Sequence, residues 1–159
     1  MDVVSVTWSL RESRASDAPW MAELRAVVMR PDLERLGRYD PVRVRQRFLD
    51  AFVAANTWVI VVEGEDVGLV AVRSENDAVW IEHFYLAPAV QGQGLGSEVL
   101  AGVLAEKGRE SARDLAEAPP FRLNVLQGSP ARRLYERHGF VVESEDAVDV
   151  FMRAESRRR

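Results

Sequence analysis

Cysteine is absent from this 159-residue chain, and histidine occurs only twice. The lack of cysteine excludes disulfides, thiolate metal sites and a cysteine nucleophile. With only two histidines, the sequence predicts no metal site. No apolar run approaches the roughly 18 to 20 residues that a membrane-spanning helix needs. Residues 1–4 also lack the basic start and apolar core of a secretory signal peptide. These absences favour a cytoplasmic protein with no membrane partner.

Basic residues are outnumbered by acidic ones, 21 to 25, which gives a formal net charge of -4. A negatively charged chain is a poor general binder of nucleic acid, and we interpret the three arginines at 157–159 as a frayed end. The hydrophobic share of 47% and the charged share of 29% are ordinary for a globular protein. We therefore expect a single domain over residues 1–159, with no nucleic-acid partner.

Hydrophobic periodicity and turn residues predict an α/β domain with the element order β-α-α-β-β-β-α-β-α-β. Strands are expected at residues 6–10, 58–62, 67–72, 78–86, 121–126 and 148–152. The second, third and fourth strands are separated by short polar turns, so they are expected to form an antiparallel meander.

Capping signals place four helices between these strands. Ser16 or Asp17 begins the first helix, and Pro31 is expected to end it. The second helix begins at residues 40–41, and the third follows the glycines near residue 95. Residues 129–130 open a short fourth helix, which Gly139 closes. The apolar face of the first helix is expected to carry Trp20, Leu24, Val27 and Val28.

Most of the functional signal lies in residues 84–96, where a strand ends, a proline turns the chain, three glycines alternate and a helix begins. Gly92, Gly94 and Gly96 would let backbone N–H groups approach a ligand closely. A helix start also offers unpaired donors and the positive end of the dipole, which together favour a phosphate or pyrophosphate. The alternative is a plain strand-to-helix turn. Three glycines just inside a helix would cost about 1 kcal/mol each relative to alanine, which favours the ligand.

Other motifs fit this segment less well. A Rossmann fingerprint would need its third glycine at position 97, which is Ser97, and an early βαβ unit rather than a meander. A P-loop would need a Gly-Lys-Ser/Thr triplet, which the chain lacks. A hydrolase is disfavoured because there is no Gly-x-Ser-x-Gly elbow.

The segment Gln91-x-x-Gly94-x-Gly96, preceded by Pro88, resembles the acetyl-CoA pyrophosphate loop of the GNAT (GCN5-related) family, Gln/Arg-x-x-Gly-x-Gly/Ala. The resemblance implies the GNAT fold, a central mixed, mostly antiparallel sheet flanked by helices, with acetyl-CoA (coenzyme A) as cofactor. Backbone N–H groups of residues 91–97 would hold the pyrophosphate, and an added-strand contact would hold the pantetheine arm. The implied cofactor residues are Tyr85, Leu86, Gln91, Gly92, Gln93, Gly94, Leu95, Gly96, Ser97, Ser129, Arg132 and Tyr135.

A second motif follows downstream, in residues 129–140. It resembles the family's C-terminal signature, Asn-x-Ala-x-x-Leu-Tyr-Glu-x-x-Gly-Phe. Two positions depart from that signature: Ser129 replaces the usual asparagine, and His138 stands where an apolar residue is more usual. Serine still caps a helix, but its shorter side chain puts the contact with the cofactor in question.

Acetyl transfer to an amine needs a base and an acid. An alkyl amine, with a pKa of about 10.4, must lose a proton before it attacks a thioester, and the leaving thiolate must gain one. Tyr135 matches the family tyrosine that protonates the thiolate; its alternative role is core packing. Glu82 is the candidate base, on a strand face expected to include Phe84, where desolvation would raise its pKa; its alternative role is to pair with an arginine. His83, on the opposite face, is the next candidate.

The acceptor pocket is expected to involve Tyr39, Phe48, Trp80, His83 and Asn124. Several arginines in the same region could bind an acceptor carboxylate, although an arginine-rich helix is usually a solvated face.

We therefore expect an N-acetyltransferase that transfers an acetyl group directly to an amine of a small molecule or peptide. A non-catalytic acyl-CoA sensor and a purely structural glycine loop are the alternatives. The family often forms homodimers, and the strand at 148–152 would offer an edge for pairing.

Overall fold

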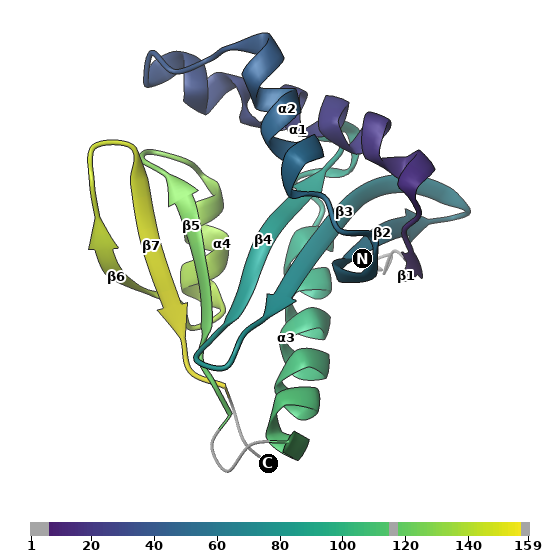
Figure 1. The fold of residues 1–159 in the computed structure, drawn as a ribbon, viewed down its shortest axis with the longest axis vertical. Helices are drawn as coiled ribbons and strands as arrows, with labels where there is room; N and C mark the ends of the chain where they lie inside the picture. The colour runs from purple at the N-terminus through teal and green to yellow at the C-terminus, as the bar shows by residue number, and fades with distance from the viewer. Residues whose placement is uncertain (1–6, 115–117, 157–159) are drawn as a thin grey trace, which may run out of the picture.

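A seven-stranded sheet organises the chain, with the strand order β1-β2-β3-β4-β5-β7-β6 (Figure 1). The computed structural model describes residues 7–114 and 118–156. The strands are β1 (Trp8–Glu12), β2 (Thr57–Val62), β3 (Glu65–Ser74), β4 (Val79–Leu86), β5 (Phe121–Leu126), β6 (Val141–Glu145) and β7 (Asp149–Ala154). The helices are α1 (Ala18–Arg35), α2 (Pro41–Ala51), α3 (Leu95–Asp114) and α4 (Ala131–Arg137).

Strands β2, β3 and β4 form the expected antiparallel meander, and β1 pairs antiparallel with the outer side of β2. Val62 pairs with Glu65, so a two-residue turn joins β2 to β3. Glu63 and Gly64 both have positive φ angles, 51° and 80°, as a tight hairpin turn with matching twist requires. Strands β5, β6 and β7 also pair antiparallel, and only β4 and β5 pair parallel. The predicted mixed, mostly antiparallel sheet is therefore confirmed.

The parallel contact between β4 and β5 is short. Only two residue pairs join these strands, Val79 with Phe121 and Trp80 with Arg122. Beyond them the strands separate, and Figure 1 shows the gap widening toward the ends of β4 and β5 that lie near α1 and α2. Each strand keeps its neighbour on the other side, β3 for β4 and β7 for β5. The two facing edges are thus left without a partner strand at the centre of the sheet.

Helices cover both faces of the sheet. On one face, α3 and α4 pack over a core that includes Val99, Leu100 and Phe140. On the other, α1 and α2 contribute Met21 and Phe48 to a smaller cluster. The buried positions of α3 recur at helical spacing, as the sequence predicts. No helix in the described ranges has the length and apolar character needed to cross a membrane.

Helix α1 differs from the prediction. It continues through Pro31 to Arg35. Proline removes one helical hydrogen bond, but both Pro31 and Val27, four residues earlier, are exposed, so water can serve the freed carbonyl. The predicted apolar face is confirmed only in part. Trp20 and Leu24 pack against the core, but the fully buried residues are Met21, Ala22 and Ala26, and Val27 is 55% exposed.

The C-terminal strands correct a second prediction. An additional strand, β6, lies at the edge of the sheet; its largely exposed, polar sequence lacks the alternation that reveals a strand. Because β6 covers β7, the strand expected at 148–152 lies inside the sheet and offers no free edge for a dimer.

Candidate active site

The glycine loop connects the open end of β4 to α3. Gly92 and Gly94 have φ angles of 75° and 83°, which favour glycine, and they precede the helix rather than lying inside it. The predicted helix-propensity cost therefore applies to Gly96 alone. The side chain of Gln91 turns back to donate from Nε2 to the Leu86 carbonyl at 2.8 Å, which fixes the loop against the strand.

The loop leaves its backbone donors open. The first helical bond of α3 runs from the Glu98 N–H to the Gly94 carbonyl. Within the described part of the chain, the N–H groups of residues 92–97 have no acceptor. These are the donors that a helix start offers to an anion, at the positive end of the dipole.

A cavity of about 360 Å³ adjoins this loop. Gly92, Gly94, Gly96 and Ser97 line one side of it, and the start of α4 lines the other. Phe84 and Leu134 give it an apolar wall, and Arg137 adds a cation. Open N–H donors, a guanidinium and an apolar wall suit a phosphate-bearing ligand with a slender apolar arm, so the residues present fit coenzyme A.

Helix α4 places Tyr135 in the core that strands from both parts of the sheet share. The side chain is 7% exposed and packs edge-on against Phe140, with ring centroids 5.7 Å apart. It lines both the loop cavity and a second, larger cleft. Burial raises the pKa of the Tyr135 phenol, so the group stays protonated at neutral pH.

The two residues that depart from the family signature both have structural roles. Ser129 Oγ accepts a hydrogen bond from the Ala131 N–H at 3.2 Å, at the start of α4. His138 Nε2 lies 2.8 Å from Ser97 Oγ and so ties the end of α4 to the first turn of α3. Arg132, by contrast, is half-exposed and forms a 3.7 Å ion pair with Glu136; it does not line the loop cavity.

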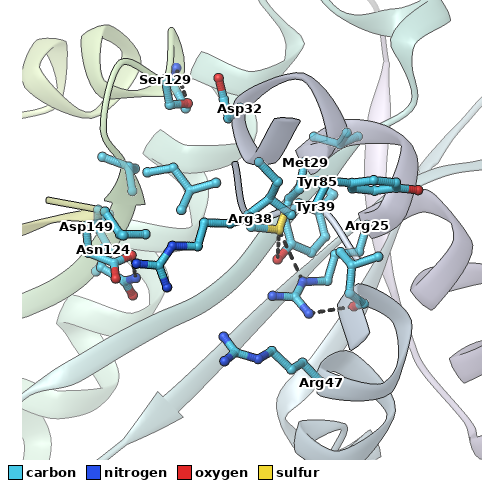
Figure 2. A pocket seen from close by; sticks show the side chains of 18 of the residues that line it. Arg25, Met29, Asp32, Arg38, Tyr39, Arg47, Tyr85, Asn124, Ser129 and Asp149 are labelled. Carbon is cyan, nitrogen blue, oxygen red and sulfur yellow. Dashed lines mark hydrogen bonds between the residues drawn. The ribbon is translucent and has the colours of Figure 1, made fainter. Parts of the chain in front are cut away.

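The second cleft has a volume of about 880 Å³ and lies between α1, α2 and the open edges of β4 and β5 (Figure 2). It brings together six site residues predicted from the sequence: Tyr39, Glu82, Tyr85, Asn124, Ser129 and Tyr135. Asn124 donates to Asp149 at 3.0 Å, and Tyr39 lies under the guanidinium of Arg30.

Three predicted acceptor residues lie away from this cleft. Phe48 is fully buried in the core under α2, so it contributes packing rather than a substrate contact. Trp80 lies beneath the guanidinium of Arg73, 5.9 Å from its ring centroid, outside the cleft lining. His83 lies behind Tyr85, with Nδ1 3.1 Å from the tyrosine hydroxyl. Burial, and then the charge of Arg25, lower the pKa of His83 to about 4, so the ring is neutral at pH 7.

Glu82 occupies a β-bulge that changes its expected surroundings. Ala71 pairs with His83 and Val72 with Ile81, which leaves Glu82 as the extra residue. Strict alternation therefore fails here, and Glu82 does not share a face with Phe84, which packs on the α3 side. Its carboxylate accepts a hydrogen bond from Arg73 instead, although the residue still lines the cleft.

The sequence reasoning missed Arg25 and Met29 on α1. Arg25 donates to the Val44 carbonyl at 2.7 Å and to the Met29 sulfur at 3.2 Å, and both residues line the cleft. Arg25 follows the buried Ala22 by three residues and Met29 follows the buried Ala26 by three, which places both near the inward side of the helix. The sequence offered no clear signal for them, because the burial of these alanines was not predicted.

Comparisons with known proteins agree with this geometry. No curated protein matches the chain. Among solved structures, the PaiA N-acetyltransferase of Thermoplasma acidophilum, determined with coenzyme A, has a TM-score of 0.71 and 17% identity over 94% of this chain and 99% of its own. The ribosomal-protein-S18-alanine N-acetyltransferase of Escherichia coli has a TM-score of 0.72 and 14% identity over 96% of both chains.

Arabidopsis thaliana Naa50, determined with the bisubstrate analogue CoA-Ac-MVNAL, has a TM-score of 0.68 and 18% identity over 94% of this chain and 99% of its own. At these identities the similarity shows the fold. The sequence itself matches the acetyltransferase (GNAT) domain family over residues 54–142, a range that contains the meander, the glycine loop and α4. The chain therefore belongs to the GNAT acetyltransferase family.

Proposed function

We propose that this protein is an acetyl-CoA-dependent N-acetyltransferase, formed by residues 1–159 as one domain, that acetylates an amine of a small molecule or peptide. The observation that carries the proposal is a continuous path. Open N–H donors at the start of α3 adjoin a cavity that Tyr135 also lines, and Tyr135 borders the larger cleft in turn. A phosphate-bearing donor and an acceptor could thus meet at one buried phenol.

The glycine loop and the open edge of β4 would hold the cofactor. The N–H groups of residues 92–97 point to the pyrophosphate as their ligand, with Arg137 as a further cation. At Tyr85 and Leu86, β4 has no neighbour on the β5 side, and this open edge is where an extended arm would bind. The Leu86 carbonyl already accepts from Gln91, so the arm would have to bond to other groups of the edge. Ser129 lines the same cavity from the α4 side.

The chemistry divides between the cofactor and the chain. Bound acetyl-CoA would supply an acyl carbon whose bond to sulfur breaks as a bond to the acceptor nitrogen forms. Tyr135 holds a proton at its phenol oxygen for the departing thiolate, because burial keeps that phenol un-ionised. The cleft walls would orient the amine and limit the access of water.

Two residues could serve as the base, Glu82 and His83. Glu82 lines the acceptor cleft and could take the amine proton directly or through water. One of its two carboxylate oxygens, Oε1, already accepts a hydrogen bond from Arg73. His83 would act only through Tyr85, since it does not line the cleft.

Isothermal titration with acetyl-CoA, with desulfo-CoA as a second ligand, tests the cofactor site. We expect saturable binding at micromolar concentrations, and no binding at millimolar acetyl-CoA would refute the proposal. Thiol release with a mixture of amines then separates an enzyme from a sensor. Tyr135→Phe should lower kcat by about 10²- to 10⁴-fold while acetyl-CoA still binds, whereas a sensor would show no turnover in either form.

A cytoplasmic location and a homodimer stay predictions from the sequence. The edge that the dimer was expected to use is covered by β6, so a dimer would need another surface.

A further inference from the structure

Four arginines line the acceptor cleft: Arg25, Arg38, Arg43 and Arg47. Among the side chains of residues 7–110 and 118–156, none of the four arginines has a carboxylate within ion-pair distance. Arginines elsewhere on the described surface are mostly paired, as Arg30 is with Glu34 and Arg122 with Glu143. The concentration of unpaired guanidinium groups in one cleft indicates a site for an anion.

Three of these groups converge on one helix. Arg43 and Arg47 are four residues apart on α2, so they lie on the same face. Arg25 reaches the same helix from α1, because its Nη1 donates to the carbonyl of Val44, between the two. Arg25 is half-buried, and its described hydrogen-bond partners are a carbonyl and a thioether, which leave its charge uncompensated.

The fourth arginine serves a different part of the cleft. Figure 2 shows Arg38 extended toward Asn124 and Asp149, on the β5 and β7 side. Arg38 also contributes to lowering the pKa of Asp146, after the two backbone N–H groups that this carboxylate accepts. The charge of Arg38 is therefore partly compensated by the carboxylate of Asp146.

Carboxylates line the cleft too, and each is already engaged. Asp32 pairs with Arg35, and Glu82 with Arg73. The others accept hydrogen bonds from neutral donors: Asp40 from two backbone N–H groups of α2, Asp146 from those of Val148 and Asp149, and Asp149 from Asn124. The guanidinium groups without an ion-pair partner therefore gather on the α2 side, and the engaged carboxylates surround them. Among these carboxylates, Asp40 has its pKa lowered by its two backbone N–H donors and then by the charge of Arg43.

We propose that the acceptor is an amine that carries a carboxylate, and that Arg25, Arg43 and Arg47 hold this carboxylate. The inference rests on the proposed acetyl transfer, because it names the substrate class of the same cleft. Guanidinium groups bind carboxylates through paired, charge-assisted hydrogen bonds, which fix orientation as well as add affinity. The carboxylate can belong to a free amino acid or to an acidic residue near a peptide N-terminus.

Matched acceptors test the proposal, with each pair differing only in the carboxylate or its charge. Tyrosine against tyramine and lysine against cadaverine represent free amino acids; the amidated dipeptides Glu-Ala and Gln-Ala represent peptides. We expect kcat/KM, measured by thiol release from acetyl-CoA, to be roughly tenfold or more higher for the carboxylated member. A preference confined to the first two pairs would identify amino acids, and one confined to the third would identify acidic peptides.

The Arg43→Gln/Arg47→Gln double variant should lower kcat/KM for the carboxylated member at least tenfold more than for its partner. Arg45→Gln is the matched control on the same helix, since Arg45 pairs with Glu23 and lies outside the cleft lining. It should preserve the preference. High salt should raise KM selectively for carboxylated acceptors, because it screens exposed guanidinium groups.

Direct binding separates this inference from the proposed function. The dissociation constants of N-acetyl-L-tyrosine and N-acetyltyramine, measured by titration with coenzyme A present, need no turnover. Tighter binding of the carboxylated compound, lost in the double variant, supports the site. Equal affinity, or no binding of either, overturns it. Failure to bind acetyl-CoA would instead refute the proposed function, whereas turnover without carboxylate preference would overturn the inference alone.

Discussion

A single methyl group at Gly94 would test whether the glycine loop holds a ligand. Gly94 has a φ of 83°, and a Cβ built there meets nothing within 4 Å. Gly94→Ala therefore causes no clash in the free protein. It adds backbone strain of about 1–2 kcal/mol, the cost of a left-handed conformation for an L-residue. It also places a methyl group at the wall of the loop cavity.

Gly64 provides a matched control. Its φ is 80°, its Cβ would likewise meet nothing within 4 Å, and it lies in the turn between β2 and β3, outside the lining of either cavity. Gly64→Ala should carry the same backbone strain of about 1–2 kcal/mol. Urea unfolding should therefore show similar losses of stability for the two variants.

Acetyl-CoA binding should distinguish the two variants. If the alanine side chain displaces the phosphate from one N–H donor, the loss is one charge-assisted hydrogen bond, about 1.5–3 kcal/mol. That corresponds to roughly a 10- to 150-fold higher dissociation constant, which isothermal titration can measure. Gly64→Ala should bind as the parent does. An unchanged dissociation constant for Gly94→Ala, with the expected stability loss, would show that the loop does not contact the phosphates.

Three further predictions concern stability. Gly68→Ala should destabilise the fold by about 1–3 kcal/mol in thermal unfolding, because its Cβ would approach the Tyr85 carbonyl oxygen within 2.4 Å and force β3 from β4; an unchanged Tm would contradict this. Burial lowers the pKa of His83 from 6.5 to about 4 in the folded protein, so as the pH falls the unfolded chain binds the proton first. The free energy of unfolding should therefore decrease between pH 6.5 and pH 4. His83→Asn should reduce this pH dependence. Asp17→Ala should lower the free energy of unfolding by about 2–4 kcal/mol, because its buried carboxylate accepts hydrogen bonds from Arg11 and Trp20. Asp66→Ala removes the exposed partner of Arg11 and should lower it by less than about 1 kcal/mol. Equal losses for the two variants would show that burial does not separate them.

Local signals in the sequence predicted the framework. Strand β5 was expected at 121–126 and lies there, because a break at two prolines and an apolar run determine it locally. Gly139 closes α4 with a φ of 90°, as its position predicts. The glycine loop was recognised from the spacing of its glycines and its resemblance to a family motif. The structure gives a different reason for glycine at positions 92 and 94: both have a positive φ, and neither lies inside the helix.

Features that depend on tertiary packing were not predictable. The bulge at Glu82 shifts the strand by one residue, and strand alternation cannot reveal a bulge. The larger cleft depends on how α1 and α2 sit over the open strands, so Arg25 could not be connected to Arg47 from the sequence. The contact between Ser97 and His138 joins residues 41 positions apart, one of which was recognised only as a departure from a motif.

The short pairing between β4 and β5 has a dynamic consequence. The N-terminal four strands and the C-terminal three form a continuous sheet only through two residue pairs, so the two halves are weakly coupled where the strands diverge. A ligand lying along the gap would contact both β4 and β5 and so connect the two parts of the sheet where the strands themselves do not pair. Saturation with coenzyme A should then slow amide hydrogen exchange in β5 and β7 as well as in the loop. It should also raise the unfolding midpoint with the logarithm of the ligand concentration above the dissociation constant. Ligand occupancy would in this way contribute to the cooperativity of the whole domain.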